Sequence, residues 1–168
     1  MVLIPEQGCR PMLRLSKLTD YATVVLAHMA RAPSALHTAA EVAAGTHLSA
    51  TTVSKLLKAM TRAGLVKSFR GVQGGYVLAR PPDRISAADI IAALDGPVAI
   101  TECSSGHSLC EFQGICRTGH AWQRINRAIH RALGEISLAD LSRPAGFRAP
   151  AMNLAAALGR DDAADTLK

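Results

Sequence analysis

A capped amphipathic helix followed directly by a glycine-rich hairpin constrains the fold more than any other feature of this sequence. Serine, a preferred N-cap residue, stands at Ser49 before ATTVSKLLKAMTRAG, and Gly64 is placed to end that helix. Its apolar residues recur at helical spacing: Val53, Leu56, Leu57 and Met60. The following stretch, LVKSFRGVQGGYVLAR, has two alternating apolar and polar runs around a glycine-rich centre. This pattern predicts a β-hairpin with a tight tip.

Two helices are predicted before this unit. Apolar residues at helical spacing predict a first helix from about Thr19 to Arg31, with Leu18 on its inner face. Thr38-Ala-Ala-Glu41 is a capping box, in which each side chain satisfies a free backbone N–H of the first turn. It predicts a short second helix that stops at Gly45.

Helical patterns also follow the hairpin. Ser86-Ala-Ala-Asp89 is a second capping box and predicts a fourth helix. A long helix with one apolar seam is predicted further on, and its seam consists of Trp122, Ile125, Ile129, Leu133 and Ile136. Such a seam is compatible with ordinary core packing and equally with a contact between two copies of the chain.

The order of these elements, with the distribution of charge, predicts a mostly α winged helix-turn-helix that binds DNA. The 168 residues carry a formal net charge of +6. No acidic residue lies between Glu41 and Asp83, whereas Lys55, Lys58, Arg62, Lys67, Arg70 and Arg80 all do. In such a fold the third helix enters the major groove and the wing lies on the backbone or in the minor groove. The predicted DNA-binding residues are Thr51, Thr52, Lys55, Lys58, Arg70 and Gly74.

The same patterns divide the chain into five parts. We expect a flexible extension over 1–11, a DNA-binding domain over 12–96 and a cysteine loop over 97–120. A dimerisation helix region over 121–143 and a flexible tail over 144–168 follow. The start of the chain does not resemble a signal peptide, and no apolar run is long enough to span a membrane, so a cytoplasmic location is predicted. No catalytic motif is recognised, and no enzymatic activity is predicted.

Three cysteines lie within fourteen residues, CSSGHSLCEFQGIC, at positions 103, 110 and 116. Structural zinc sites usually show cysteine pairs two to four residues apart, and this spacing is different. Thiolates in a loop of glycine and small polar residues suit an iron–sulfur cluster. A thiol–disulfide switch needs no particular spacing and stays open as an alternative, as do cysteines with no shared role. Candidates for a fourth cluster ligand include His107, His120 and an acidic side chain elsewhere.

Several of these stretches together resemble the Isc/Suf/Nsr-type regulators of the Rrf family. The resemblance covers roughly residues 12 to 141 and includes LRLSKLTDYA, the helix with its wing, and the cysteine loop followed by AWQRINRAIHRAL. The phrases ITEC, WQRIN and SLADL most resemble the regulator of the Suf iron–sulfur assembly system. The resemblance implies a homodimeric transcription factor, without a membrane partner, that binds promoter DNA and senses iron–sulfur cluster status to control cluster-assembly genes.

The resemblance also implies a ligand set for the cluster. Cys103, Cys110 and Cys116 match the cysteines that hold a cluster in the family, which would have two irons and two sulfides, or four irons. The Isc-type histidine falls here on Gly119, with His120 one residue later. The nitric-oxide-sensing members use an aspartate in a phrase similar to KLTD, which here contains Asp20. Asp20 is therefore the preferred fourth ligand, with His120 and His107 as alternatives. A nitric-oxide-sensing regulator and a cluster-free redox-sensing repressor are the alternative functions.

Overall fold

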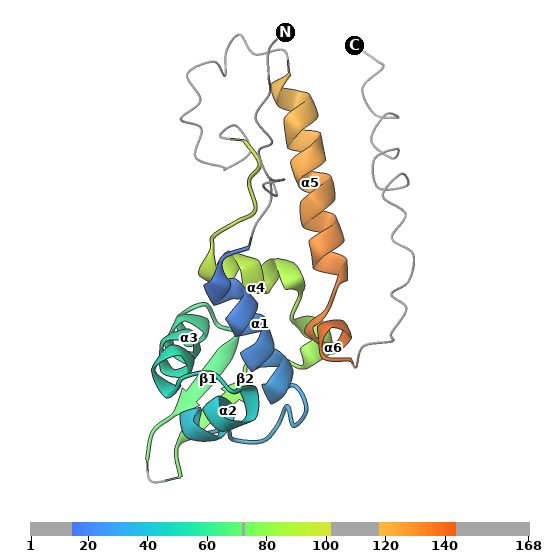
Figure 1. Cartoon of the computed structure of the whole chain (residues 1–168). Helices are drawn as coiled ribbons and strands as arrows, with labels where there is room; N and C mark the ends of the chain where they lie inside the picture. Colours follow the sequence, from blue (N-terminus) through green and yellow to red (C-terminus); the bar gives the residue numbers. More distant parts are fainter. Residues whose placement is uncertain (1–14, 72, 102–117, 144–168) are drawn as a thin grey trace, which may run out of the picture.

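The computed structural model describes residues 15–71, 73–101 and 118–143, which form a mostly helical winged helix-turn-helix (Figure 1). The cysteines at 103, 110 and 116, His107, the extension and the tail predicted from sequence lie outside these residues. The elements run in the order α1 Lys17–Met29, α2 Ala39–Thr46, α3 Ala50–Arg62, β1 Val66–Phe69, β2 Gly75–Leu78, the 3₁₀ turn η1 Pro82–Arg84, α4 Ala87–Leu94, α5 Gly119–Glu135 and α6 Leu138–Leu141. The predicted fold class is confirmed. No helix in the described ranges is long and apolar enough to cross a membrane.

The helix starts follow the capping signals in the sequence. The Ser49 side chain accepts a hydrogen bond from the Thr52 backbone N–H, 3.2 Å away, at the start of α3. The predicted capping box at α2 is complete, because Glu41 also accepts from the Thr38 N–H at 2.8 Å. Hydrogen bonds from Thr38 lower the pKa of Glu41. The box at Ser86 is likewise complete. Local side-chain chemistry therefore fixes where each of these helices begins.

The wing is a two-stranded antiparallel hairpin in which Val66 pairs with Leu78 and Phe69 with Gly75. Gly71 has φ +123°, a conformation that side-chain-bearing residues rarely adopt. A Cβ atom on Gly74 would lie 2.5 Å from the carbonyl oxygen of Phe69. The tip thus depends on glycine at both positions. Below the tip, the backbone groups of Tyr76 and His37 exchange two hydrogen bonds of 2.8 Å, which tie the wing to the segment before α2.

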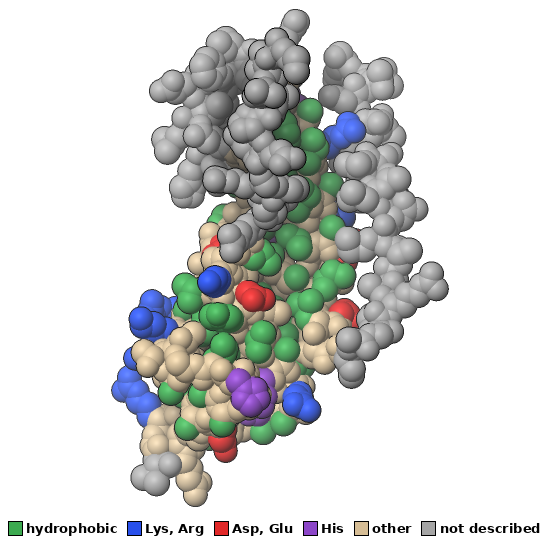
Figure 2. Space-filling view, in the orientation of Figure 1, with side chains coloured by type: hydrophobic (Ala, Val, Ile, Leu, Met, Phe, Trp, Pro, Cys, Tyr) green, Lys and Arg blue, Asp and Glu red, His purple; other side chains and the backbone are tan. Residues whose placement is uncertain are grey.

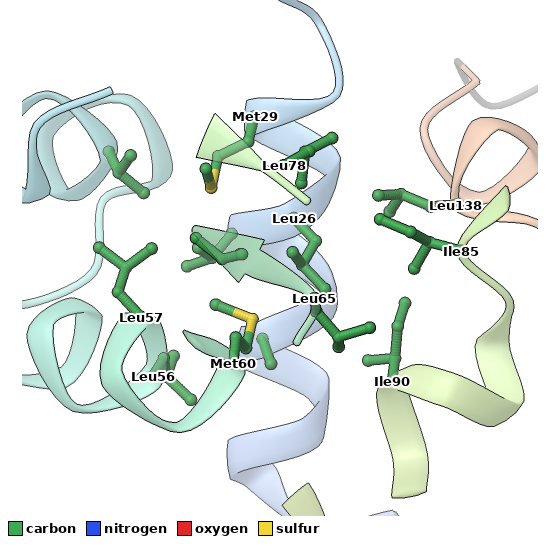
Figure 3. Packing of buried hydrophobic residues seen from close by; sticks show 14 of the residues in the cluster. Leu26, Met29, Leu56, Leu57, Met60, Leu65, Leu78, Ile85, Ile90 and Leu138 are labelled. Carbon is green, nitrogen blue, oxygen red and sulfur yellow. The ribbon is translucent and has the colours of Figure 1, made fainter. Parts of the chain in front are cut away.

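The core lies where α1, α3 and the wing meet, and it is aliphatic (Figure 3). Its fully buried members include all four residues that the α3 pattern places inward, and Val25, Leu26 and Met29 of α1. Burying a side chain of this size contributes roughly 1.5–3 kcal/mol. Leu18 differs from the prediction, since it remains 50% exposed on the first turn of α1. Its neighbour Thr19, by contrast, is fully buried.

The chain returns to the core after α5. Leu138, at the start of α6, is fully buried and lies beside Ile85 (Figure 3). Two backbone hydrogen bonds hold it there: Leu138 N–H to the Ile85 carbonyl at 2.7 Å, and Ala87 N–H to the Ile136 carbonyl at 2.8 Å. The C-terminal end of the long helix is therefore attached firmly to the winged helix, near the start of α4.

Helix α5 extends away from this attachment (Figure 1). Ala128 is buried, but Trp122 and Ile125 are each 39% exposed. The first half of this seam is therefore not fully buried within one chain. At 1.5 Å per residue, α5 is about 25 Å long and presents an extended apolar face.

Candidate nucleic-acid interface and cysteine region

The polar face of α3 carries the side chains predicted to meet DNA. Thr51, Lys55 and Lys58 are exposed. They lie four and three residues apart, a spacing that puts them on the same side of a helix. The opposite side of α3 is buried in the core, so the outward direction of these three residues is fixed by packing. The result is a rigid helix that presents a threonine and two lysines to solvent.

Thr52 has a different environment from these three residues. Its hydroxyl lies 2.8 Å from the Ser49 hydroxyl, and its backbone N–H is bound by the same side chain. Thr52 is half-buried, and its polar groups take part in the N-cap. The sequence could not distinguish Thr52 from Thr51, because both follow the capping serine in the first turn.

The wing places a second set of groups beside α3. Arg70 is exposed at the end of β1, and Gly74 is half-buried in the tip. The buried pair Val66 and Leu78 identifies the inner face of the hairpin. Residues alternate between faces along a strand, so Lys67 and Phe69 lie on the outer face. Phe69 is 54% exposed there, and sequence analysis had not singled it out.

Basic side chains gather along the edge of the molecule formed by α3 and the wing (Figure 2). Not all basic residues of this region contribute equally. Arg80 is paired with Asp89, with an N–O distance of 3.3 Å, and that ion pair offsets its charge. Lys55, Lys58 and Arg70 have no acidic neighbour in the same stretch of chain. A local positive surface of this kind attracts a polyanion.

The two described candidates for the fourth cluster ligand lie on different elements. Asp20 is exposed in the first turn of α1, and His120 is exposed in the first turn of α5. Figure 1 shows the first turn of α1 beside the end of α4, whereas the first turn of α5 lies at the far end of that long helix. Within one chain the described residues do not bring Asp20 and His120 together. These residues also contain no group of three or more His, Cys, Asp or Glu side chains placed so that they could hold a metal ion together.

One carboxylate joins the first turn of α1 to the end of α4. Asp95 Oδ2 accepts a 2.8 Å hydrogen bond from the Thr19 hydroxyl and a 3.1 Å bond from the Ser16 backbone N–H. Hydrogen bonding from Ser16, and less strongly from Thr19, lowers the pKa of Asp95, although partial burial opposes the shift. The chain then turns at Gly96, with φ +85°, toward the cysteine segment. Asp20 is therefore adjacent to the point from which that segment departs.

The helix-turn-helix, its wing and the basic face define a winged-helix protein of the nucleic-acid-binding class. Comparison with known families agrees, since residues 15–144 match the Rrf2 family model, described as an iron-dependent transcriptional regulator. The chain belongs to the Rrf2 family of transcriptional regulators.

Individual relatives give the same result. The chain is 31% identical over 134 residues to the HTH-type transcriptional regulator CymR of Bacillus subtilis, covering 77% of this chain and 90% of CymR. HTH-type regulators of Neisseria meningitidis match at 37% identity over 95 residues, which are 56% of this chain and span 64% of their own length.

Solved structures show the same fold. The structure of CymR, the global cysteine regulator of B. subtilis, aligns with a TM-score of 0.61 at 30% identity, covering 77% of this chain and 96% of that one. The structure of T. potens IscR aligns with a TM-score of 0.56 at 29% identity, covering 77% and 85%. Both alignments reach well beyond the helix-turn-helix itself. The relatives are named as regulators rather than enzymes.

Proposed function

We propose that this chain is a homodimeric transcriptional regulator that binds promoter DNA under the control of an iron–sulfur cluster. The DNA-binding domain would be 12–96, the cysteine loop 97–120 and the dimerisation region 121–143. The genes controlled are those of iron–sulfur cluster assembly, of the Suf type. The observation that carries the DNA-binding part is the acid-free basic face of α3 and the wing.

DNA binding follows from the geometry of that face. An α-helix fits the major groove, and Thr51, Lys55 and Lys58 on its open side reach base edges or phosphates. Thr52 takes part in the N-cap at the start of this helix and belongs to the same proposed DNA-binding surface. Arg70 and the closely turned backbone at Gly74 contact the neighbouring phosphates or the minor groove. Phosphate contacts of this kind supply affinity, and contacts to base edges supply specificity.

Replacing Lys55 or Arg70 with alanine tests this placement. Each substitution should weaken DNA binding by roughly 1–3 kcal/mol if the side chain contacts a base. If it contacts a phosphate, the slope of log affinity against log salt concentration should fall by about 1. Fluorescence anisotropy on the protein's own upstream region at several salt concentrations measures both effects. Arg84→Ala is the matched control, since Arg84 lies on η1 outside the basic face. Unchanged binding in both test variants would remove α3 and the wing from the interface.

The cysteine segment supports the sensing part of the proposal. Three thiolates and one carboxylate form a donor set that suits iron, and the family description includes dependence on iron. Cys103, Cys110 and Cys116 would hold the cluster, with Asp20 as fourth ligand and His120 or His107 as alternatives. A bound cluster supplies a redox-sensitive, releasable centre. The chain's own part is to present Asp20, which the first turn of α1 holds exposed beside the start of the cysteine segment.

The apolar seam of α5 supports the homodimer. Trp122 and Ile125 are each 39% exposed in the single chain, and two such helices crossing would bury the exposed part of both seams. A symmetric dimer presents two α3 helices, which matches the half-site arrangement of helix-turn-helix operators. In this arrangement a cluster would lie between the winged helix of one subunit and the long helix α5.

A cluster-free thiol/disulfide regulator is the second candidate. The similarity to CymR, named as the global cysteine regulator of B. subtilis, favours it, and the same three cysteines would serve as the switch. The two candidates differ in iron content. They share the DNA interface, so the Lys55 and Arg70 experiment does not separate them.

A further inference from the structure

We infer that Asp95 is a positioning residue that holds Asp20 in place for the cluster by binding the first turn of α1. This inference rests on the proposed cluster site. It adds Asp95, which is not one of the proposed cluster ligands, as a residue that supports the site. It concerns the junction of three features: the start of α1, the end of α4 and the start of the cysteine segment.

The hydrogen bonds at this junction are short and converge on one atom. Asp95 Oδ2 accepts from the Thr19 hydroxyl at 2.8 Å and from the Ser16 N–H at 3.1 Å. The Ser16 hydroxyl also caps α1 by accepting from the Thr19 N–H at 3.1 Å. One carboxylate oxygen therefore satisfies a free N–H at the helix start and a side-chain hydroxyl one turn further on.

The Thr19 side chain is the part of this contact that lies inside the protein. It is fully buried, so its hydroxyl requires a partner inside the protein. Asp95 supplies that partner from a position 76 residues away in the chain. Asp20 is the next residue after Thr19, and its exposed side chain projects from the same turn. Fixing Thr19 consequently fixes the backbone from which the proposed ligand projects.

The other end of the contact leads to the cysteines. Asp95 is the C-cap of α4, and Gly96 follows in a left-handed conformation. A few residues later, the Ile100 N–H donates to Asn126 Oδ1 of α5 at 3.3 Å. The chain is therefore held at both Asp95 and Ile100 before Cys103. Asp95 therefore links the first turn of α1 to the chain just before the cysteine segment.

The physical effect is preorganisation of the ligand set. Groups that orient a metal ligand without touching the metal typically change metal affinity by about 10–100-fold when removed. Loss of the Asp95 carboxylate frees the first turn of α1, which then needs ordering whenever Asp20 binds. The cluster should still form, but it should be released faster.

The experiment compares full-length variants reconstituted without oxygen. Asp95→Ala and Thr19→Val, which keeps the shape but not the hydroxyl, should each shorten cluster lifetime roughly tenfold under a ferrous chelator. Asp95→Asn and Thr19→Ser should restore much of it, because each retains one hydrogen-bonding partner. Asp83→Ala is the matched control for loss of an exposed aspartate. Because the Thr19 hydroxyl is buried, Asp95→Ala should also lower the melting temperature of the apo form, so cluster lifetimes are compared at a temperature where circular dichroism shows every variant fully folded.

A double-mutant cycle shows whether Asp95 acts through Asp20. If it does, Asp20→Asn with Asp95→Ala should release the cluster no faster than Asp20→Asn alone. Additive effects, or wild-type lifetimes in both Asp95→Ala and Thr19→Val, would overturn the inference and leave the proposed function standing. Wild-type protein that takes up no iron would overturn the cluster assignment, and this inference with it.

Discussion

Ile125→Asp is expected to convert the dimer into a monomer and to reduce DNA affinity by at least about tenfold. Ile125 belongs to the apolar seam of α5 and is 39% exposed in the single chain. Burying an unpaired carboxylate between two such helices costs several kcal/mol, which is a large part of the association energy of a small interface. A monomer keeps one α3 and reads one half-site. Sedimentation velocity and anisotropy on the same sample measure both changes.

The control for this variant is His130→Asp. His130 is exposed on the polar face of the same helix, so the substitution introduces the same carboxylate outside the seam. We expect it to remain dimeric. Circular dichroism of Ile125→Asp should still show a folded helical protein, since the residue is not part of the core, and its melting temperature should fall only by the stability that dimerisation contributes. A dimeric Ile125→Asp protein would place the subunit contact elsewhere.

Leu138→Ala is expected to lower the free energy of unfolding by about 2–5 kcal/mol, because it leaves a cavity in a packed site. Leu138 is fully buried although it lies at the start of a helix of only four residues near the end of the described chain. It packs in the same cluster as Ile85 and Ile90. Urea unfolding at constant protein concentration, followed by circular dichroism, measures the loss.

Leu141→Ala separates packing from helix propensity in this experiment. Leu141 is in the same short helix but is 40% exposed, so the same change should cost far less, within about 1 kcal/mol. Equal effects of the two substitutions would show that α6 is not anchored through Leu138.

Much of the fold was predictable because short-range chemistry determines it. The capping residues Thr38, Ser49 and Ser86 each begin a helix as predicted, since their hydrogen bonds join residues only three positions apart. The hairpin was predictable for the same reason, because its glycine-rich tip is also a short-range signal. Helix periodicity identified the buried side of α3 correctly. It misplaced Leu18, because periodicity says which face of a helix is apolar and not how far the core extends along it.

The parts of the site that sequence reasoning missed depend on long-range contacts. Asp95 and Thr19 are 76 residues apart, and a lone aspartate at a helix end has no pattern that indicates such a partner. Leu138 is fully buried, and nothing in its local sequence indicates that it completes the core. The role of Thr52 in the cap required a side-chain distance. Phe69 on the outer wing face was a readable signal, since strand alternation from Val66 assigns it to that face.

Parallel measurement of iron and DNA affinity tests the central claim most directly. Protein purified without oxygen, beside a variant with all three cysteines replaced by serine, is assayed for iron, sulfide and visible absorption, and each is titrated with its upstream DNA. The account predicts iron and sulfide in similar amounts with a brown colour in the wild type, neither in the variant, and different DNA affinities for the two. Wild-type protein that stays iron-free after reconstitution and binds DNA as the variant does would contradict it.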